Sequence, residues 1–536
     1  MALRTVREAT FDVWRERGLT TIFANPGSTE ISLLTDLPDD LRFVLALHES
    51  SVVGIATGWA LARGEPGLAI LHTTAGLGNA VGAIATARVN RAPLVIVVGQ
   101  QDRRHLAHEP FLAGKLLGLA GEYPVWIDQP VRAQDVPGAV ARAYNEAVTG
   151  EGPALVIVPM DDWEVEAEPD NQHAAAAHVL RSRAVDADSV AKLAAFLSSA
   201  KSPALVVGAG ADTPETWAAL VALAERLGCA VWQESFSARA GFPQDHALFA
   251  GHLPADRARL RETLSPYDAV LAVGAPVFRQ YPYIPGPFVE LGTRVAMVSK
   301  YPAEVHRSVV ELAVLADPGP VCAALVEAVA PRGGVERPRP FPRPGPPMPP
   351  AAGEPLRAGH VLAALADRLP RNAIVIEESP SSRPELIARL PARESGGAIS
   401  PAMGGLGFAL PAATGMRLAQ TERPVVAIIG DGSSLYGIQG LWTAATYGAG
   451  VLLVILANGG YAIMDRLAEQ HGGAPPWPSF DVDIVGLATA FGCPARRITE
   501  HGELLDVLDE VVPGLAGRTE PLLLEVVVAP DATFAP

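Results

Sequence analysis

The sequence predicts an α/β protein made of three doubly wound domains with mainly parallel sheets. Two observations predict this class. Short runs rich in Val, Ile and Leu are each followed by a Gly-containing turn and then by an Ala/Leu-rich helical stretch, which is the pattern of parallel βαβ units. The chain also has 536 residues, which is too long for one hydrophobic core and indicates about two to four domains.

The strand-like runs fall into three successive blocks. They are LAIL at 68–71 and LVIVVG at 94–99, then ALVVGAG at 204–210 and AVLAVG at 269–274, then VVAIIG at 425–430 and VLLVILAN at 451–458. Each block therefore predicts one parallel sheet covered by helices.

Composition separates the blocks. Residues 165–183 are polar and rich in Ala and His, and residues 331–356 are crowded with proline. Proline fixes φ and removes a hydrogen-bond donor, so the second stretch is expected to be an extended linker. The predicted domains are 1–165, 184–330 and 357–536, with the linker at 331–356.

Charge and composition restrict the partners. The 58 acidic and 42 basic residues give a net charge of −16, which argues against a nucleic acid or an anionic membrane and favours a small-molecule ligand. The N-terminal segment has charges inside each apolar run and predicts an amphipathic helix rather than a signal peptide. No run of about 18 uncharged apolar residues occurs, and three cysteines are too few for a disulfide framework. We therefore expect a cytoplasmic protein.

The segment 428–463 contains the strongest functional pattern. A strand ends at Gly430-Asp431-Gly432, and Asn458 follows the next strand, with 25 residues between Gly432 and Asn458. Glycines let a diphosphate approach the backbone, and a helix start at about Ser433 would offer free N–H groups to that anion. Asp431 and Asn458 supply the oxygen ligands that Mg²⁺ prefers. An isolated GDG could equally be a plain turn after a strand.

Two further segments carry candidate residues. Glu49 stands between a strand and an Ala/Gly-rich helix, where a carboxylate could also be a charge that stabilises the helix start. Residues 401–415 form a Gly-rich turn that opens into a helix, and Leu406 in that turn could be an ordinary packed leucine.

Together these segments resemble the thiamine-diphosphate-dependent decarboxylase family, and the benzoylformate decarboxylases in particular. The agreement extends over nearly the whole chain, including NPGS at 25–28, GNA at 78–80, GAPVFR at 274–279, GGLGFALPAA at 404–413 and LWTAA at 441–445. The resemblance implies a pyrimidine-binding first domain, a central domain and a third domain that binds the diphosphate and Mg²⁺. It implies metal ligation by Asp431, Asn458 and Gly460.

By the same resemblance, Glu49 would hydrogen-bond the aminopyrimidine ring and promote removal of the thiazolium C2 proton. Leu406 would hold the cofactor in its bent form. The cofactor-binding residues would be Asn25, Pro26, Gly27, Glu49, Gly404, Gly405, Leu406, Gly430, Asp431, Gly432, Ser433, Asn458, Gly460 and Tyr461.

The resemblance also implies a small-molecule 2-oxo acid substrate, which is decarboxylated to an aldehyde. Ser28 would contact its carboxylate, and His72 would transfer a proton, a task that suits a side chain titrating near neutrality. His72 could instead only satisfy a backbone group at the end of its strand. The substrate pocket would contain Ser28, His72, Tyr281, Pro380, Ile463, Met464 and Leu467.

Several positions depart from the benzoylformate decarboxylase pattern. Tyr281 replaces a second catalytic histidine, and a phenol with a pKa near 10 is a poor proton carrier at neutral pH. Pro380 replaces a threonine, and Ile463 replaces a smaller residue. These changes put benzoylformate itself in doubt as the substrate and leave other aryl or branched 2-oxo acids open.

Two alternatives remain. Loss of the histidine at 281 would favour a carboligase that forms 2-hydroxy ketones, although acetolactate synthases carry TSGPG where this chain has HTTAGLGN. A non-catalytic homologue is the other alternative. The resemblance further implies that each active site is shared between two chains, so a homodimer is the minimum and a homotetramer is expected.

Overall fold

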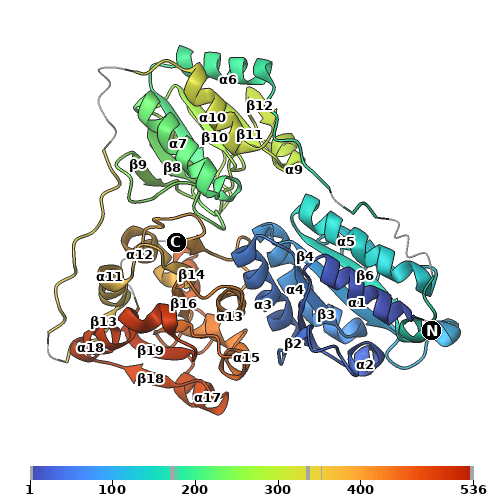
Figure 1. The fold of residues 1–536 in the computed structure, drawn as a ribbon. Coiled ribbons are helices and arrows are strands. Elements are labelled where there is room, and N and C mark those ends of the chain that lie inside the picture. Colours follow the sequence, from blue (N-terminus) through green and yellow to red (C-terminus); the bar gives the residue numbers. More distant parts are fainter. Residues whose placement is uncertain (1–3, 169–174, 178, 333–338, 352, 531–536) are drawn as a thin grey trace.

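The computed structural model describes residues 4–168, 175–177, 179–332, 339–351 and 353–530. Three parallel sheets, each flanked by helices, form three domains that contact one another (Figure 1). Every ladder between the named strands in the described residues is parallel. The predicted fold class is confirmed.

The first sheet has the strand order β2-β1-β3-β4-β6-β5. Its strands are β1 (Thr21–Asn25), β2 (Arg42–Leu45), β3 (Gly67–Leu71), β4 (Leu94–Gln100), β5 (Trp126–Asp128) and β6 (Pro153–Pro159). Its helices are α1 (Val6–Glu16), α2 (Ile31–Leu34), α3 (Glu49–Arg63), α4 (Thr73–Asn90) and α5 (Val136–Gly150). Neighbouring residues of β1 enter different cores, Ile22 on one face and Phe23 on the other, so helices cover both faces.

The central sheet has the order β12-β11-β10-β7-β8-β9. Its strands are β7 (Pro203–Val207), β8 (Ala230–Gln233), β9 (Phe249–His252), β10 (Ala269–Val273), β11 (Arg294–Ser299) and β12 (Leu312–Leu315). Its helices are α6 (Ala187–Ser199), α7 (Pro214–Leu227), α8 (Arg257–Leu264), α9 (Pro302–Arg307) and α10 (Pro318–Ala328).

The third sheet has the order β13-β19-β17-β16-β14-β15, and β18 pairs with β19. Its strands are β13 (Leu356–Arg357), β14 (Ile374–Glu378), β15 (Ala398–Ile399), β16 (Val425–Gly430), β17 (Leu452–Ala457), β18 (Ala495–Ile498) and β19 (Leu522–Ala529). Its helices are α11 (Ala358–Arg368), α12 (Arg383–Arg389), α13 (Ala409–Ala419), α14 (Asp431–Leu435), α15 (Gly440–Thr446), α16 (Ala462–Gln470), α17 (Ile484–Ala490) and α18 (His501–Val511).

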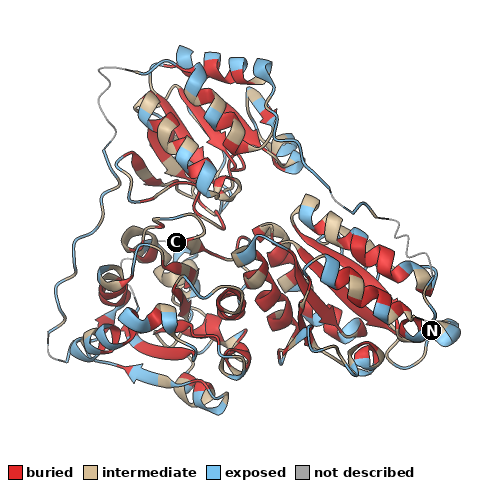
Figure 2. Cartoon of the chain, viewed as in Figure 1, coloured by how far each residue is buried: buried red, intermediate tan, exposed pale blue. Residues whose placement is uncertain are grey.

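The strands form the buried interior of each domain, and exposed residues lie on the outer sides of the helices (Figure 2). The proline-rich stretch is only partly described, because residues 333–338 and 352 lie outside the described ranges. Residues 339–351 contain no helix or strand and run along the outside of the molecule (Figure 1). None of the described helices is long and apolar enough to span a membrane.

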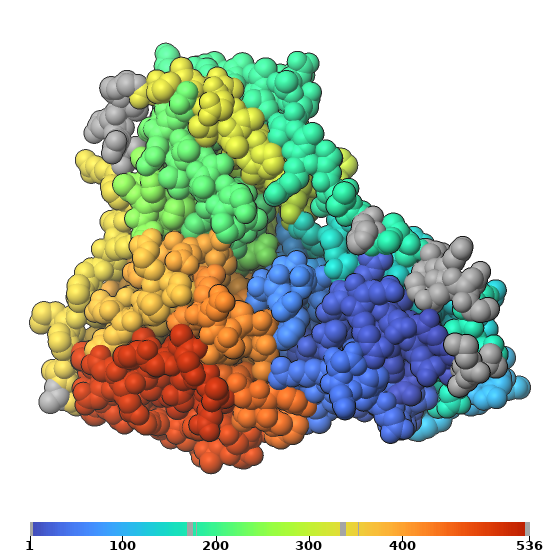
Figure 3. Space-filling view, in the orientation of Figure 1, coloured from blue at the N-terminus to red at the C-terminus, as the bar shows by residue number. Residues whose placement is uncertain are grey.

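The first and third domains meet at a crossing of α3 and α13. A Cβ at Gly58 would lie 1.9 Å from the carbonyl oxygen of Ala412, and a Cβ at Gly415 would lie 1.8 Å from that of Ile55. The two backbones therefore approach each other more closely than any side chain would permit. The space-filling view shows the green central domain resting on the orange and blue domains (Figure 3).

Candidate active site

A cavity of about 410 Å³ opens in the third domain, within the size range of small-molecule sites. It lies where β14, β16 and β17 end, which is the edge of an open parallel sheet that binds ligands. Its lining residues are Ser379, Pro380, Ser381, Ser382, Leu406, Gly430, Asp431, Gly432, Ser433, Tyr436, Leu456, Asn458, Gly460, Tyr461, Ile463, Met464 and Trp477. Most candidates predicted in this domain therefore line one cavity.

Asp431 is held by backbone N–H groups of α14 and of the loop after β17. Its Oδ1 accepts a hydrogen bond from the Gly432 N–H (2.8 Å), and its Oδ2 accepts from the N–H groups of Asn458 (2.9 Å) and Gly459 (2.7 Å). Burial raises the pKa of Asp431, and the N–H donors oppose that rise. The expected helix start near Ser433 is wrong: α14 begins at Asp431 because its N-cap is Gly430, the last residue of β16.

Asn458 and Tyr461 complete this part of the cavity. The side-chain oxygen of Asn458 accepts a hydrogen bond from the Gly460 N–H at 3.1 Å. A Cβ at Gly432 would lie 2.6 Å from the Tyr461 ring and 3.1 Å from the Phe480 ring. A glycine at 432 thus makes room for these two rings, whose centroids are 5.2 Å apart.

Leu406 stands on a turn that Glu378 organises. The Glu378 carboxylate, buried at the end of β14, accepts hydrogen bonds from the N–H groups of Gly407 (2.6 Å), Phe408 (2.8 Å) and Ala409 (2.6 Å). Burial raises the pKa of Glu378 to about 7, against the opposing effect of these donors. Gly404 and Gly407 have φ values of 72° and 86°, which favour glycine. Leu406 lines the cavity and remains 36% exposed.

Glu49 lies in the first domain, as the first residue of α3. It is buried, and its two carboxylate oxygens accept hydrogen bonds from the side-chain amides of Asn25 and Asn79, each at 3.0 Å. Asn25 ends β1 and Asn79 is on α4. Donors from two elements therefore fix the direction of this carboxylate.

His72 is oriented by a second carboxylate. Its Nδ1 lies 2.9 Å from Thr29 Oγ1 and 3.0 Å from Glu30 Oε2. Because Nδ1 faces these oxygens, Nε2 is the ring nitrogen left for a ligand. Gly27 donates its N–H to Glu30 at 2.7 Å, and a Cβ on Gly27 would come within 2.5 Å of the His72 ring.

The residue after His72 has a strained backbone. Thr73 has φ 35°, which is costly for a β-branched residue, and its buried hydroxyl has no hydrogen-bond partner among the described residues. Such strain is typical of functional sites. Gly99, at the end of β4, leaves room for Glu30, since a Cβ there would lie 1.7 Å from its Oε1.

The structure gathers the candidates into two groups on different domains. Asn25, Gly27, Glu49 and His72 form the first group, with Pro26 and the exposed Ser28 between them in sequence, whereas the cavity is lined by the third domain alone. Gly404, Gly405 and Leu467 do not line the cavity. Gly405 instead lies against Thr86 of α4, where a Cβ would meet the threonine hydroxyl at 2.7 Å.

Tyr281 joins neither group. It belongs to the central domain, is 63% exposed, and donates its backbone N–H to the carbonyl of Ala255 at 3.1 Å.

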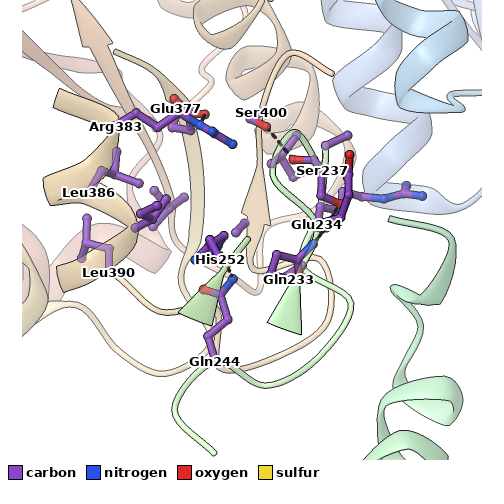
Figure 4. A pocket seen from close by; sticks show the side chains of 17 residues that line it. Gln233, Glu234, Ser237, Gln244, His252, Glu377, Arg383, Leu386, Leu390 and Ser400 are labelled. Carbon is purple, nitrogen blue, oxygen red and sulfur yellow. Dashed lines mark hydrogen bonds and ion pairs between the residues drawn. The ribbon is translucent and has the colours of Figure 1, made fainter. Parts of the chain in front are cut away.

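A smaller cavity lies between the central and third domains (Figure 4). Its volume of about 50 Å³ suits one or two water molecules rather than a substrate. His252 is half-buried there, beside the Gln244 amide at 3.3 Å, and its buried Nδ1 has no partner among the described residues. Burial, together with the positive charges of Arg383 and Arg343, lowers the pKa of His252 to about 3.

Sequence reasoning missed Glu30, Asn79, Glu378 and Trp477. Two of them had a signal: Asn79 lies in the GNA match, and Glu30 follows Gly27 at the spacing by which a side chain accepts from the N–H at a helix start. Glu378 and Trp477 had no such signal. Glu378 binds backbone groups about thirty positions later in the chain, and Trp477 binds Asp465, twelve positions earlier.

Three family models match the chain. They are the N-terminal TPP binding domain of thiamine pyrophosphate enzymes at residues 4–115, their central domain at 190–325 and their C-terminal TPP binding domain at 387–526. These models cover more than half of the chain.

Relatives match over the full length. Benzoylformate decarboxylase from Pseudomonas aeruginosa is 38% identical, and the match covers 100% of both chains. The structure of a thiamine-diphosphate-dependent 4-hydroxybenzoylformate decarboxylase from Rhodococcus jostii RHA1 matches with a TM-score of 0.93 and 34% identity, covering 99% of this chain and 100% of that one. Benzoylformate decarboxylase from Polynucleobacter necessarius matches with a TM-score of 0.92 and 33% identity, covering 99% of each chain. The chain therefore belongs to the thiamine-diphosphate-dependent enzyme family that includes the benzoylformate decarboxylases.

Proposed function

We propose that this protein removes CO₂ from a benzoylformate-like 2-oxo acid and releases an aldehyde, without net oxidation. The full-length similarity to benzoylformate decarboxylase supports this reaction class. The observation that carries the proposal is the geometry around Glu49 and His72. Hydrogen bonds from neighbouring side chains hold each of them in one orientation, and proton transfer requires such a fixed geometry.

The cavity in the third domain fits thiamine diphosphate with Mg²⁺. Asp431 Oδ1 accepts one hydrogen bond from the described residues and keeps a lone pair, and Asn458 adds a neutral oxygen. One carboxylate with phosphates and water is a usual environment for Mg²⁺. Ser379 supports the fit as well, since its buried hydroxyl lines the cavity and has no partner among the described residues.

The residues would divide the chemistry as follows. When bound, thiamine diphosphate accepts the electron pair that the leaving CO₂ releases. Glu49 would hold a proton at the ring nitrogen of the aminopyrimidine. His72 would move a proton through Nε2 at the substrate's 2-oxygen, and Ser28 would bind the substrate carboxylate.

Two chains would share each active site. The Glu49 group and the cavity lie on different domains, and exposed apolar side chains adjoin both: Ile31 and Leu47 near the first group, and Tyr436 and Met464 at the cavity. Such apolar surfaces mark interfaces. A homodimer with twofold symmetry would cover both surfaces and bring Glu49 of one chain to the cavity of the other, and two such dimers would form the tetramer.

We keep the domain limits 1–165, 184–330 and 357–536 as part of the proposal. The positions of the three sheets support them, apart from Leu356, the first residue of β13, which falls inside the proposed linker. The first domain would bind the pyrimidine and the third the diphosphate.

The decisive assay measures CO₂ release with thiamine diphosphate and Mg²⁺ from aryl, branched and short 2-oxo acids, with products identified by mass spectrometry. Free aldehyde from an aryl substrate is the expected result. No CO₂ from any of these acids would refute the proposal.

A carboligase is the second candidate, and the place of Tyr281 favours it. Tyr281 stands where the benzoylformate decarboxylase pattern has a second histidine, but it is exposed and joins neither group of site residues, so no imidazole at this position would protonate the carbanion. The same assay with added aldehyde separates the two functions, because a carboligase would yield mainly 2-hydroxy ketones.

A further inference from the structure

The lining of the cavity divides into a polar and an apolar set. The polar set, Asp431, Ser433 and Asn458, follows β16 and β17. The part of the apolar set that comes from α16 and the segment after it is Ile463, Met464 and Trp477. The polar set suits a diphosphate with its cation, which leaves the apolar set for the substrate side group.

Trp477 belongs to a stiff segment. The run 474–478 reads APPWP, so three of its five residues are proline. Proline fixes its own φ and restricts the residue before it to extended conformations. Because prolines also lack an N–H, this run has few backbone donors with which to bind the rest of the protein. Contacts of the residues around the prolines must therefore position it.

Two anchors hold the segment across the cavity. The Trp477 indole Nε1 donates a hydrogen bond to Asp465 Oδ1 at 2.9 Å, and Asp465 is the residue after Met464 on α16. Beyond the prolines, the Phe480 N–H donates to the carbonyl of Gly459 at 3.1 Å, and its ring packs on Tyr461. The indole thus has a fixed orientation relative to the apolar set.

We infer that Trp477, oriented by Asp465, is the wall that limits the size of the substrate side group, so that one aryl ring is accepted in preference to two fused rings. This inference rests on the proposed function. A flat indole face packs well on a planar ring. The β-branched Ile463 and the anchored indole both border the cavity, where they would limit the space for a second fused ring. Trp477 is a specificity-determining residue, and Asp465 is a positioning residue that acts through it.

The test compares kcat/KM for 2-oxo-2-phenylacetate and for its 2-naphthyl analogue. Trp477→Ala removes the wall, so the naphthyl-to-phenyl ratio should rise about tenfold or more, the scale on which pocket shape discriminates. Asp465→Leu and Trp477→Phe each remove one partner of the indole hydrogen bond and should shift the ratio in the same direction. The double variant Asp465→Leu/Trp477→Phe should shift it no further than Trp477→Phe alone, because Asp465 acts only through the indole.

Conservative and matched controls distinguish a positioned wall from a general disturbance. Asp465→Asn keeps a side-chain acceptor and should retain the wild-type ratio. Glu469→Leu removes a carboxylate from the same helix one turn away and should also leave the ratio unchanged.

If the wild type decarboxylates the phenyl substrate and none of the Trp477 and Asp465 variants changes the ratio, the wall is refuted while the proposed function stands. If the wild type decarboxylates neither substrate, both proposals fail.

Discussion

At the scale of single residues, Glu49 is the most direct test of the chemistry. Glu49→Gln keeps one acceptor oxygen but turns an NH₂ group towards Asn25 or Asn79, which are themselves donors. We expect kcat to fall by about 10²- to 10⁴-fold, the usual share of a proton-transfer group, while thiamine diphosphate still binds in calorimetry. The exposed Glu122→Gln serves as control, and wild-type turnover in Glu49→Gln would contradict the mechanism.

Asp431 tests cofactor retention rather than proton transfer. Asp431→Ala removes the proposed metal ligand and the acceptor for three backbone N–H groups. We expect the affinity for thiamine diphosphate in Mg²⁺ to fall by about 10- to 100-fold or more, and added chelator to have little further effect. Calorimetric titration measures both, with the exposed Asp506→Ala as control. If Asp431→Ala binds thiamine diphosphate as tightly as the wild type and the chelator still weakens that binding, the cation is held by other residues.

Residue identity was more predictable than residue orientation. The places of the glycines around Asp431 and of Asn458 could be predicted from the local sequence, because each directly follows or ends a recognisable parallel strand. Trp477 could not be found in this way, since its direction depends on a hydrogen bond to Asp465, twelve positions earlier in the chain. Tyr281 entered the prediction only through the alignment, and it stands apart from both groups of site residues.

At the scale of elements, the crossing of α3 and α13 is the contact most sensitive to added atoms. Gly58→Ala would place a Cβ 1.9 Å from the Ala412 carbonyl oxygen, so the two helices must move apart. We expect a loss of about 1–3 kcal/mol in the free energy of unfolding, measured by urea denaturation. Gly82→Ala in α4 is the matched control, because a Cβ there meets no atom within 4 Å. Equal stability of the two variants would rule out a tight crossing.

Elements were predicted best where they are buried on both faces. Residues 425–430 form a continuous β-branched and apolar run, which is typical of a parallel strand with helices on both faces. The strand β16 has the same bounds. The start of α14 was misplaced by two residues because Gly430 both ends the strand and caps the helix. Such a direct strand-to-helix transition leaves no loop signal in the sequence.

At the scale of the whole molecule, mixed dimers test whether two chains share a site. In a dimer of Glu49→Gln and Asp431→Ala chains, one site receives both substitutions and the other receives neither. Random mixing after joint refolding should restore about a quarter of wild-type activity, because half of the dimers are mixed and each has one intact site. Each variant refolded alone is the control. No recovery on mixing would mean that each chain uses its own residues.

The acid stability of the molecule should depend on His252, between the central and third domains. Its pKa is lowered to about 3, chiefly by burial, whereas an unfolded histidine titrates near 6.5. Below pH 6.5 this histidine is therefore protonated in the unfolded chain but not in the folded chain. The free energy of unfolding falls as the pH drops through this range. Between pH 7 and 5 the wild type should lose about 2 kcal/mol more than His252→Gln. Urea unfolding at both pH values measures this, and parallel losses would contradict it.

The α3–α13 crossing also has a consequence for chain connectivity. Since the first and third domains are joined by direct backbone approach, the covalent path through residues 339–351 is not what keeps them together. That path runs along the outside without helix or strand, so a nick within it should leave the two resulting polypeptides associated. Covalent continuity at that stretch is therefore dispensable for the pairing of the first and third domains, and limited proteolysis there should release neither of them.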